Sequence, residues 1–245
     1  MNDPTQEIPQ ELDPSFHRWE KGESGFECHA DSEGIEGFEG EFLWVGVGGG
    51  QYEQKGRALA SRSQLRSLCI DGRNIPQPLI DATGEILGLE RLHLGNIGPR
   101  SLSPLRRLAR IKSLYLEGIR GAQQLSILGM ANLESVSISG DSDAVVSLLQ
   151  EGNSNVRCLI LGGTASANLK LPDLELLRRL PSIEYLILLN VSVSSRSLEP
   201  CLSLPRLRQV ILNFARSWDR DSIDALREKG ISVRCRMDEI RLQMS

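Results

Sequence analysis

The residue types that most often carry out chemistry are scattered along this chain. Its three histidines, His17, His29 and His93, lack a cysteine or aspartate at the spacing of zinc ligands or of a catalytic triad, and Cys28 beside His29 is the closest approach. Serine-hydrolase, zinc-protease and calcium-loop motifs do not occur. We therefore predict a protein without catalytic residues, metal site or cofactor. The alternative is a cryptic enzyme whose site lies in the first 50 residues.

A glycine run at Gly48–Gly50 invites comparison with a phosphate-binding loop because Lys55 follows it. The spacing differs from the GxxxxGK(S/T) pattern, since residues 51–54 separate this lysine from the last glycine. The backbone amides and the lysine reach a phosphate together only at the spacing of that motif. We therefore interpret residues 48–50 as a turn.

The elements that position every other side chain come from one repeated apolar pattern, (L/I/V/F)-x-x-(L/V)-x-(L/I/V). Its successive starts are 23, 24, 22, 22, 23, 27 and 24 residues apart, and such a constant period is typical of repeat proteins. The first, fourth and sixth positions of the eight copies are Phe42-Val45-Val47, Leu65-Leu68-Ile70, Leu89-Leu92-Leu94, Ile111-Leu114-Leu116, Leu133-Val136-Ile138, Val156-Leu159-Leu161, Ile183-Leu186-Leu188 and Leu207-Val210-Leu212.

Each copy predicts a half-buried strand, because positions 4 and 6 point inward while positions 3, 5 and 7 point outward. Two residues after the sixth position, seven of the eight copies have a Gly or Asn, residues that tolerate positive φ. This position therefore predicts a turn. These turn residues are Gly49, Gly72, Asn96, Gly118, Gly140, Gly163 and Asn190. Before the strands, apolar residues spaced by three predict short helices or 3₁₀ segments that face the same core. Examples are Leu102-Leu105-Leu108, Leu174-Leu177-Leu180 and Leu198-Cys201-Leu204.

In register, period and turn residue, residues 42–237 resemble the leucine-rich repeat family, in particular its short intracellular or bacterial-type repeats. The resemblance implies an α/β solenoid with a parallel β-sheet on its concave face and short helices, 3₁₀ segments or loops on its convex face. It also implies that the concave face binds a protein partner. The family's usual Asn, three places after the last strand leucine, is not kept, and we expect a variant turn carried by the preceding Gly or Asn.

The outward strand positions are the candidate binding site. In the later copies they hold apolar residues, and a contiguous exposed apolar patch normally marks an interaction surface. The alternatives are that a segment of the long repeat or the C-terminal tail covers the patch, or that the chain self-associates through it. The candidate partner-binding residues are Tyr115, Cys158, Ile160, Tyr185, Ile187, Leu189, Gln209, Ile211 and Asn213.

Charged residues at the second position of seven copies alternate in sign along the chain. Neighbouring parallel strands lie about 4.8 Å apart, so each charge is expected to lie between two of opposite sign. We predict a device that supports the register and contributes well under about 1 kcal/mol per exposed pair. The residues are Arg66, Glu90, Lys112, Glu134, Arg157, Glu184 and Arg208.

Residues 1–41 are a separate compositional block, with twelve acidic and two basic residues. The whole chain carries −4, so residues 42–245 carry +6. The acidic block also contains four aromatic residues, Phe16, Trp19, Phe26 and Phe38. They indicate that residues 16–41 fold back as a cap, for instance a hairpin, because a solenoid must cover its terminal apolar face. A solvated leader, or an acidic block that occupies a basic partner, are the alternatives.

We predict three regions: the acidic leader and cap at 1–41, the solenoid at 42–237, and a C-terminal tail at 238–245. The longest step of the repeat contains an insertion at about 164–173, for which a loop at the border of the binding face or plain variation in loop length is expected. Near the end, Ser222 is expected to cap a helix over 223–229 that Gly230 ends, before a last strand over 231–237.

Several absences point to a cytoplasmic protein. No apolar stretch approaches the roughly 20 residues that cross a membrane, and the start lacks the features of a signal peptide. Five cysteines in an odd, unpaired arrangement argue against a disulfide framework. Arginines without interleaved aromatic residues, in a chain that is acidic overall, do not favour nucleic acid. We expect neither nucleic acid nor a membrane as partner.

The sequence therefore predicts a non-enzymatic protein-protein interaction module. One specific version is a bacterial immunity or antitoxin-type inhibitor that binds a toxin, which rests on analogy with repeat proteins of similar size. The alternative is a regulatory subunit or scaffold for a signalling enzyme such as a phosphatase.

Overall fold

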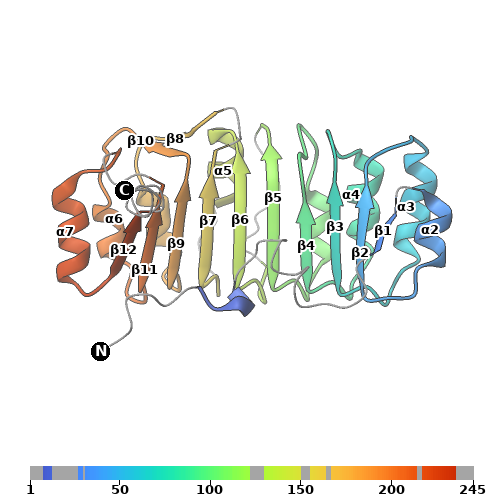
Figure 1. Cartoon of the computed structure of the whole chain (residues 1–245), viewed down its shortest axis with the longest axis horizontal. Helices are drawn as coiled ribbons and strands as arrows, with labels where there is room; N and C mark the ends of the chain where they lie inside the picture. Colours follow the sequence, from blue (N-terminus) through green and yellow to red (C-terminus); the bar gives the residue numbers. More distant parts are fainter. Residues whose placement is uncertain are drawn as a thin grey trace, which may run out of the picture.

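The structure, a computed structural model, describes residues 8–12, 27–29, 31–121, 130–149, 155–163, 167–213 and 217–235. Within these residues ten strands form one parallel sheet, in the order in which they follow in the sequence (Figure 1). The strands are β1 (Glu27–His29), β2 (Phe42–Gly46), β3 (Ser67–Asp71), β4 (Arg91–Leu94), β5 (Ser113–Ile119), β6 (Ser135–Gly140), β7 (Cys158–Gly162), β9 (Tyr185–Leu189), β11 (Gln209–Leu212) and β12 (Ser232–Cys235).

Short helices join successive strands and lie on one face of the sheet (Figure 1). They are α2 (Ser32–Gly37), α3 (Tyr52–Ala60), α4 (Gln77–Thr83), η2 (Ser103–Arg107), α5 (Ser142–Leu149), η4 (Glu175–Arg179), α6 (Glu199–Leu202) and α7 (Arg220–Glu228). The opposite face, which corresponds to the expected concave face, is called the open face below.

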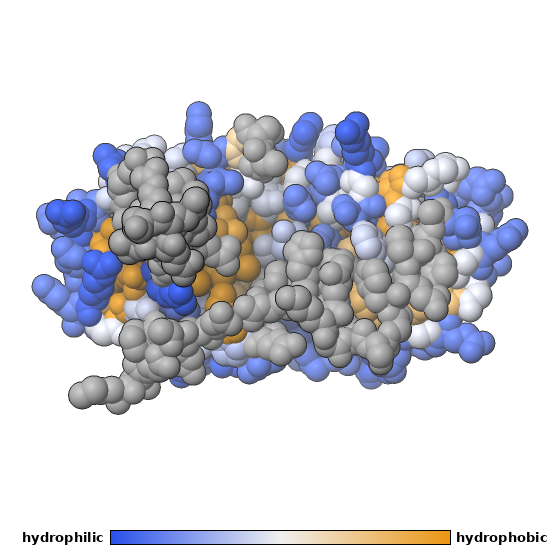
Figure 2. Space-filling model, in the orientation of Figure 1, coloured by the Kyte–Doolittle hydropathy of each residue, from blue (hydrophilic) through white to orange (hydrophobic). Residues whose placement is uncertain are grey.

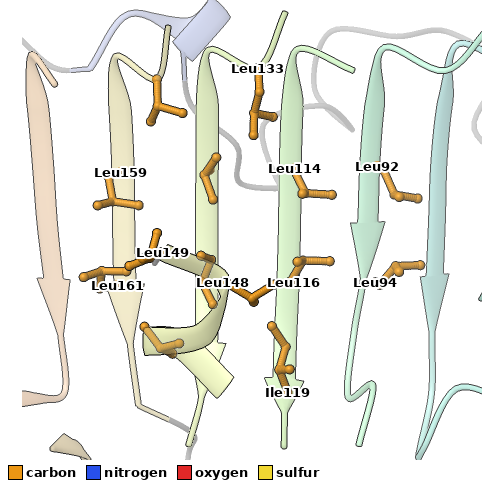
Figure 3. Packing of buried hydrophobic residues seen from close by; sticks show 14 of the residues in the cluster. Leu92, Leu94, Leu114, Leu116, Ile119, Leu133, Leu148, Leu149, Leu159 and Leu161 are labelled. Atoms are coloured by element: carbon orange, nitrogen blue, oxygen red, sulfur yellow. The ribbon is translucent and has the colours of Figure 1, made fainter. Parts of the chain in front are cut away.

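The core lies between the sheet and the helices. Leu92, Leu114 and Leu159 belong to one row of inward side chains that crosses the sheet, and Leu94 and Leu116 belong to the next row (Figure 3). These five leucines are at most 1% exposed. The three apolar series before the strands are also buried, at 0–2% exposed, so the predicted two-sided core is confirmed.

The predicted register holds from the second repeat to the last, and is wrong in the first. Leu43 pairs with Leu68 and Val45 with Ile70, so the inward positions of β2 are Leu43 and Val45 rather than Val45 and Val47. Phe42 points to the open face instead of the core. Phe42, Val45 and Val47 satisfy the repeat pattern in full, whereas the observed register has Gly40 at the first position, so the pattern alone favoured the wrong register.

Two physical reasons place Gly or Asn in the turns. Asn96 and Gly118 have φ of 54° and 66°, as predicted. Gly140 is not a positive-φ residue; a Cβ there would lie 2.3 Å from the carbonyl oxygen of Ile119, and one at Gly163 would lie 2.3 Å from that of Ala167. In these two turns the constraint is the close approach of two backbone segments.

Side-chain amides bridge successive repeats near the start of the strands. Asn132 Nδ2 donates to the carbonyl of Ala109 at 2.7 Å, and Asn155 Nδ2 donates to that of Ala131 at 2.6 Å. Each amide satisfies a carbonyl that the preceding segment leaves without a backbone partner, as the family's usual turn asparagines would do elsewhere.

The described ends of the solenoid differ from expectation in detail. β1 pairs in parallel with β2, and α2 lies between them in the chain. The rest of the predicted cap, residues 16–26, lies outside the described residues. Helix α7 is capped by Asp219, whose carboxylate accepts from Ser222 N at 3.0 Å, and not by Ser222. The boundaries 1–41, 42–237 and 238–245 stay a prediction.

The long repeat also contains an element that the sequence did not suggest. Strand β8 (Leu169–Leu171) pairs in parallel with β10 (Val191–Val193) to form a second, two-stranded sheet. Leu169 and Leu171 are 1–2% exposed and belong to the core. The described part of the insertion is therefore a strand that supports the solenoid rather than a free loop.

None of the helices in the described ranges has the length and apolar character needed to cross a bilayer.

Candidate binding surface

The open face carries two rows of side chains that cross the strands, here called row 3 and row 5 after their position in the repeat. Row 3 is Phe42, Ser67, Arg91, Ser113, Ser135, Cys158, Tyr185, Gln209 and Ser232. Row 5 is Trp44, Cys69, His93, Tyr115, Ser137, Ile160, Ile187, Ile211 and Arg234. Both rows are mainly polar from β4 to β6 and mainly apolar from β7 to β11, and Figure 2 shows hydrophobic residues gathered over these later strands.

Among the described residues, the open face carries two apolar clusters: a small one of Phe42, Cys69 and Trp44, and a larger one, here called the open-face cluster. It consists of Cys158, Tyr185, Ile187 and Ile211, with the partly buried Ile160 and Leu189 packed against them. Six of the nine predicted binding residues are therefore brought together. Gln209 adjoins the cluster in row 3, whereas Tyr115 and Asn213 are placed elsewhere.

The expectation that this patch is exposed is wrong. Cys158, Tyr185, Ile187 and Ile211 are 0%, 4%, 2% and 9% exposed. The side chains of Ile8 and Leu12, from the N-terminal end of the chain, belong to the same cluster and are 8% and 0% exposed. A segment of the N-terminal block therefore helps to cover the patch, whereas the sequence suggested the long repeat or the C-terminal tail for this role. Residues 238–245 of that tail lie outside the described residues.

The covering segment is short. Residues 8–12 contain the single 3₁₀ turn η1 (Gln10–Leu12), closed by a hydrogen bond from Leu12 N to the carbonyl of Pro9 at 2.9 Å. In Figure 1, η1 lies at the ends of β6 and β7 where these strands begin. The hydroxyl of Ser135, on β6, donates to the carbonyl of Leu12 at 2.6 Å. Glu11 between the two anchors points to solvent.

Simple energetics indicate that this segment is held weakly. Burial of two aliphatic side chains gains about 3–6 kcal/mol, and one buried hydrogen bond adds about 1 kcal/mol. Fixing the backbone of five residues costs about 5–10 kcal/mol. The net free energy that holds residues 8–12 is therefore at most about 2 kcal/mol, in contrast to the strands of the solenoid, which share a continuous core.

The earlier part of the open face is polar and aromatic. The rings of His93 and Tyr115 stack with centroids 4.2 Å apart, and Arg91 Nε donates to Ser67 Oγ at 2.8 Å. Burial, then the charges of Glu117 and Asp71, raise the pKa of Tyr115 to about 12. Tyr115, a predicted binding residue, thus lies near the charges of Glu117 and Asp71 and not in the open-face cluster.

The carboxylates of Asp71 and Glu117 lie near the ends of β3 and β5, with β4 between these strands. Burial raises the pKa of Glu117, and the charge of Asp71 raises it further. Burial also lowers the pKa of Arg91. The region can bind polar groups of a partner, but groups of three or more potential metal ligands are not found within the described ranges.

The predicted ladder of alternating charges is present over part of its length, at the edge where the strands begin. Lys112 Nζ lies 2.8 Å from Glu90, while Glu184 binds Arg157 at 2.7 Å and Arg208 at 3.3 Å. The hydrogen bond from Arg157, and then the charges of Arg157 and Arg208, hold the pKa of Glu184 below its usual value. Because Glu184 is only 6% exposed, its ion pair is better shielded from water than the predicted exposed pairs.

A polar pocket of about 260 Å³ opens at this same edge. It is lined by Ala131, Asn132, Glu134, Asn155, Arg157, Ser182 and Arg206. Several of its polar groups already bind within the chain: the amides of Asn132 and Asn155 donate to backbone carbonyls, and Arg157 binds Glu184. The pocket therefore belongs to the packing between repeats.

The glycine run that invited comparison with a phosphate loop is part of an internal contact. Lys55 is 2% exposed, and its ammonium group donates to the carbonyl of Gly48. A lysine held in this way cannot reach a bound phosphate, so the interpretation of residues 48–50 as a turn agrees with the geometry.

Asn213, the last predicted binding residue, lies in a turn. Its Nδ2 donates to Oδ1 of Asn190 at 2.8 Å, one repeat earlier. Its role in the described structure is to join successive turns.

Together, the stacked repeats and the two-faced sheet define a leucine-rich repeat solenoid with the α/β architecture that the resemblance implied. A similar fold occurs in an internalin (inlF) from Listeria monocytogenes, with a TM-score of 0.53 and 16% identity. The match covers 79% of this chain and 53% of that one, so this chain spans about half the length of that internalin. An internalin C2 (inlC2) from the same organism has a TM-score of 0.44 and 16% identity, over 72% of this chain and 73% of that one.

No model of a known protein family and no curated protein sequence matches the chain. At 16% identity the likeness to internalins concerns the fold alone. Function has to be argued from the open face of this chain.

Proposed function

We propose that this chain is a non-enzymatic module that binds a protein partner through the open face of its repeats. The observation that carries the proposal is the open-face cluster, because strand residues on a face without helices are polar in most sheets that face water. Aliphatic and aromatic residues on such a face are typical of a surface that is buried against another chain. The polar half, with Arg91, His93 and Tyr115, provides directional contacts at its side.

The finer proposal is an immunity or antitoxin-type inhibitor that covers one partner in a one-to-one complex. A continuous binding face supports this idea, since inhibition of another protein requires a large surface rather than a pocket. A regulatory scaffold is the second candidate, and it would bind several partners instead of one. The odd number of cysteines, five, favours action in a reducing compartment such as the cytoplasm.

Affinity capture with the full chain tests the proposal. The wild type should retain a partner from the native lysate, and Ile187→Glu should lose it because a carboxylate is placed in the apolar part of the surface. Tyr185→Ala should weaken retention at least ten-fold. Glu175→Gln, on the helical face, is the control and should retain the partner at wild-type level.

Circular dichroism and the melting temperature have to remain at wild-type values in all variants. Equal retention of the partner by the wild type and by folded Ile187→Glu would show that the binding site lies elsewhere. Capture of several unrelated partners through the open face would favour the scaffold over the inhibitor.

A further inference from the structure

Residues 8–12 pack on the open-face cluster, and their contacts indicate which kind of ligand this surface accepts. We propose that residues 8–12 are a built-in substitute for the partner, which binds by displacing them with a short segment that carries two aliphatic side chains. This inference rests on the proposed function, and it adds the chemistry of the partner and a step that regulates access.

The contacts of the segment carry little sequence information beyond two apolar side chains. Ile8 and Leu12, four positions apart, are its buried anchors, while Glu11 is exposed. The hydrogen bond from Ser135 is accepted by a backbone carbonyl, which any residue offers. Another chain with aliphatic residues at the same spacing could therefore make every one of these contacts.

The segment leaves polar atoms of row 3 unsatisfied on both sides of it. Among the described residues, Ser113 Oγ and Gln209 Oε1 are buried without a hydrogen-bond partner, and these residues are 5% and 3% exposed. Ser113, on β5, pairs with Ser135 on β6, and Gln209, on β11, pairs with Tyr185 on β9. Buried polar atoms normally have partners, so these two point to a ligand that is longer than the segment.

The span of the missing ligand follows from the sheet. Ser113 and Gln209 lie four strand spacings apart in row 3, or about 19 Å at about 4.8 Å per strand. An extended segment of about six residues covers that distance at about 3.3 Å per residue. A partner segment of this length, with donors near both ends and two aliphatic residues between them, would satisfy Ser113 and Gln209 and would compete well with residues 8–12.

Release of the segment can be measured without knowledge of the partner, by labelling buried thiols in the full chain with iodoacetamide. Cys158 belongs to the open-face cluster, whereas Cys201 belongs to the core behind the sheet. In the double variant Ile8→Asp/Leu12→Asp, the labelling rate of Cys158 should rise at least ten-fold while that of Cys201 stays unchanged. Glu11→Ala, in the same segment, should label like the wild type.

Cys201 reports on the fold as well as serving as the control. A rise in the labelling rates of both thiols would mean that the double variant unfolds. In that case the single variant Ser135→Ala takes the place of the double variant, because it removes one hydrogen bond and leaves the apolar contacts in place. It should raise the labelling rate of Cys158 about three-fold. Unchanged labelling of Cys158 in both variants would overturn the proposal, because the cover would not depend on residues 8–12.

Binding of a defined probe completes the test. A fluorescent peptide with the sequence of residues 5–15 should bind the double variant at least ten-fold more tightly than the wild type, in which the surface is occupied. The same peptide with aspartate in place of both aliphatic residues should not bind. Equal affinity for wild type and variant, no binding to either, or dimers of the variant in place of peptide binding would each overturn the proposal.

Failure of this inference and failure of the proposed function give different results. A captured partner that binds the wild type and the double variant equally rejects displacement and leaves partner binding intact. A variant that admits the peptide but whose Ile187→Glu derivative still captures the partner shows that residues 8–12 cover the cluster, and rejects the proposed function because the partner then binds elsewhere.

Discussion

The hydroxyl of Ser135 donates a 2.6 Å hydrogen bond to the backbone carbonyl of Leu12, a residue 123 positions earlier in the chain. Ser135 is 1% exposed and Leu12 is fully buried. This contact joins the N-terminal block to the middle of the solenoid, on the face that we propose for partner binding. The predictions below test this contact and the packing behind it.

Ser135→Ala should loosen residues 8–12 without unfolding the solenoid. The loss of one buried hydrogen bond costs about 1 kcal/mol, which is comparable to the net free energy that holds the segment. We expect the amides of residues 8–12 to exchange about five-fold faster, by hydrogen exchange, with a change in melting temperature of at most a few degrees.

Ser113→Ala is the matched control, because Ser113 is the neighbour of Ser135 in row 3 and its hydroxyl has no partner among the described residues. It should leave exchange at residues 8–12 unchanged and be neutral or slightly stabilising. Faster exchange in both variants would assign the effect to the row in general rather than to the bond with Leu12.

Two adjacent residues of β9 should differ in their contribution to stability although both are buried. Leu186 is 0% exposed in the core, while Ile187 is 2% exposed in the open-face cluster. Leu186→Ala should lower the free energy of unfolding by about 2–5 kcal/mol, as for other core leucines.

Ile187→Ala should cost less than about 2 kcal/mol, because the weakly held segment above it can adjust to the smaller side chain. Urea denaturation of the two variants measures the difference. Equal losses would mean that residues 8–12 are as firmly packed as the core.

Acid should weaken the fold partly through Glu184. Its pKa is lower in the folded chain than the ordinary value of 4.5, chiefly because of the hydrogen bond from Arg157. The folded state therefore prefers the ionised carboxylate, and its contribution is fully present above about pH 4.5 and is lost as the pH falls through the lower folded value.

Glu184→Gln should lower the free energy of unfolding at pH 7 by about 1.5–3 kcal/mol, the range for hydrogen bonds to charged groups. It should also flatten the loss of stability below pH 4.5 when urea denaturation is repeated over a pH series. Glu175→Gln, which removes an exposed pair with Arg178, should change stability by less than about 1 kcal/mol. Identical pH profiles for Glu184→Gln and the wild type would contradict this assignment.

The turn glycines should differ in their tolerance of a side chain. Gly140→Ala places a Cβ 2.3 Å from the carbonyl oxygen of Ile119, and the strands must separate to accept it, at a cost of about 1–3 kcal/mol. Gly48→Ala has no atom within 4 Å of the new Cβ. It should be neutral or slightly stabilising by thermal denaturation, and an equal loss in both variants would contradict the close approach.

The sequence determined the repeat, the inward positions from Leu65 onward and the two layers of the core, because each is set by side chains that recur at a fixed spacing along the chain. It favoured the wrong register of β2, since the pattern that starts at Phe42 is complete, whereas the register set by the pairing of Leu43 with Leu68 has Gly40 at its first position. It also identified the apolar strand positions Tyr185 and Ile187 as unusual, through their contrast with the polar residues that water-facing strands require.

Only the tertiary structure decided what lies on those positions. Ile8 and Leu12 belong to an acidic block without a repeat, and their composition alone favours a solvated leader or an end cap. Contacts with strands more than 120 positions away leave no periodic trace in the sequence. They arise because the open-face cluster gains free energy from any aliphatic side chain that the chain can bring to it, and the N-terminal segment is long enough to reach.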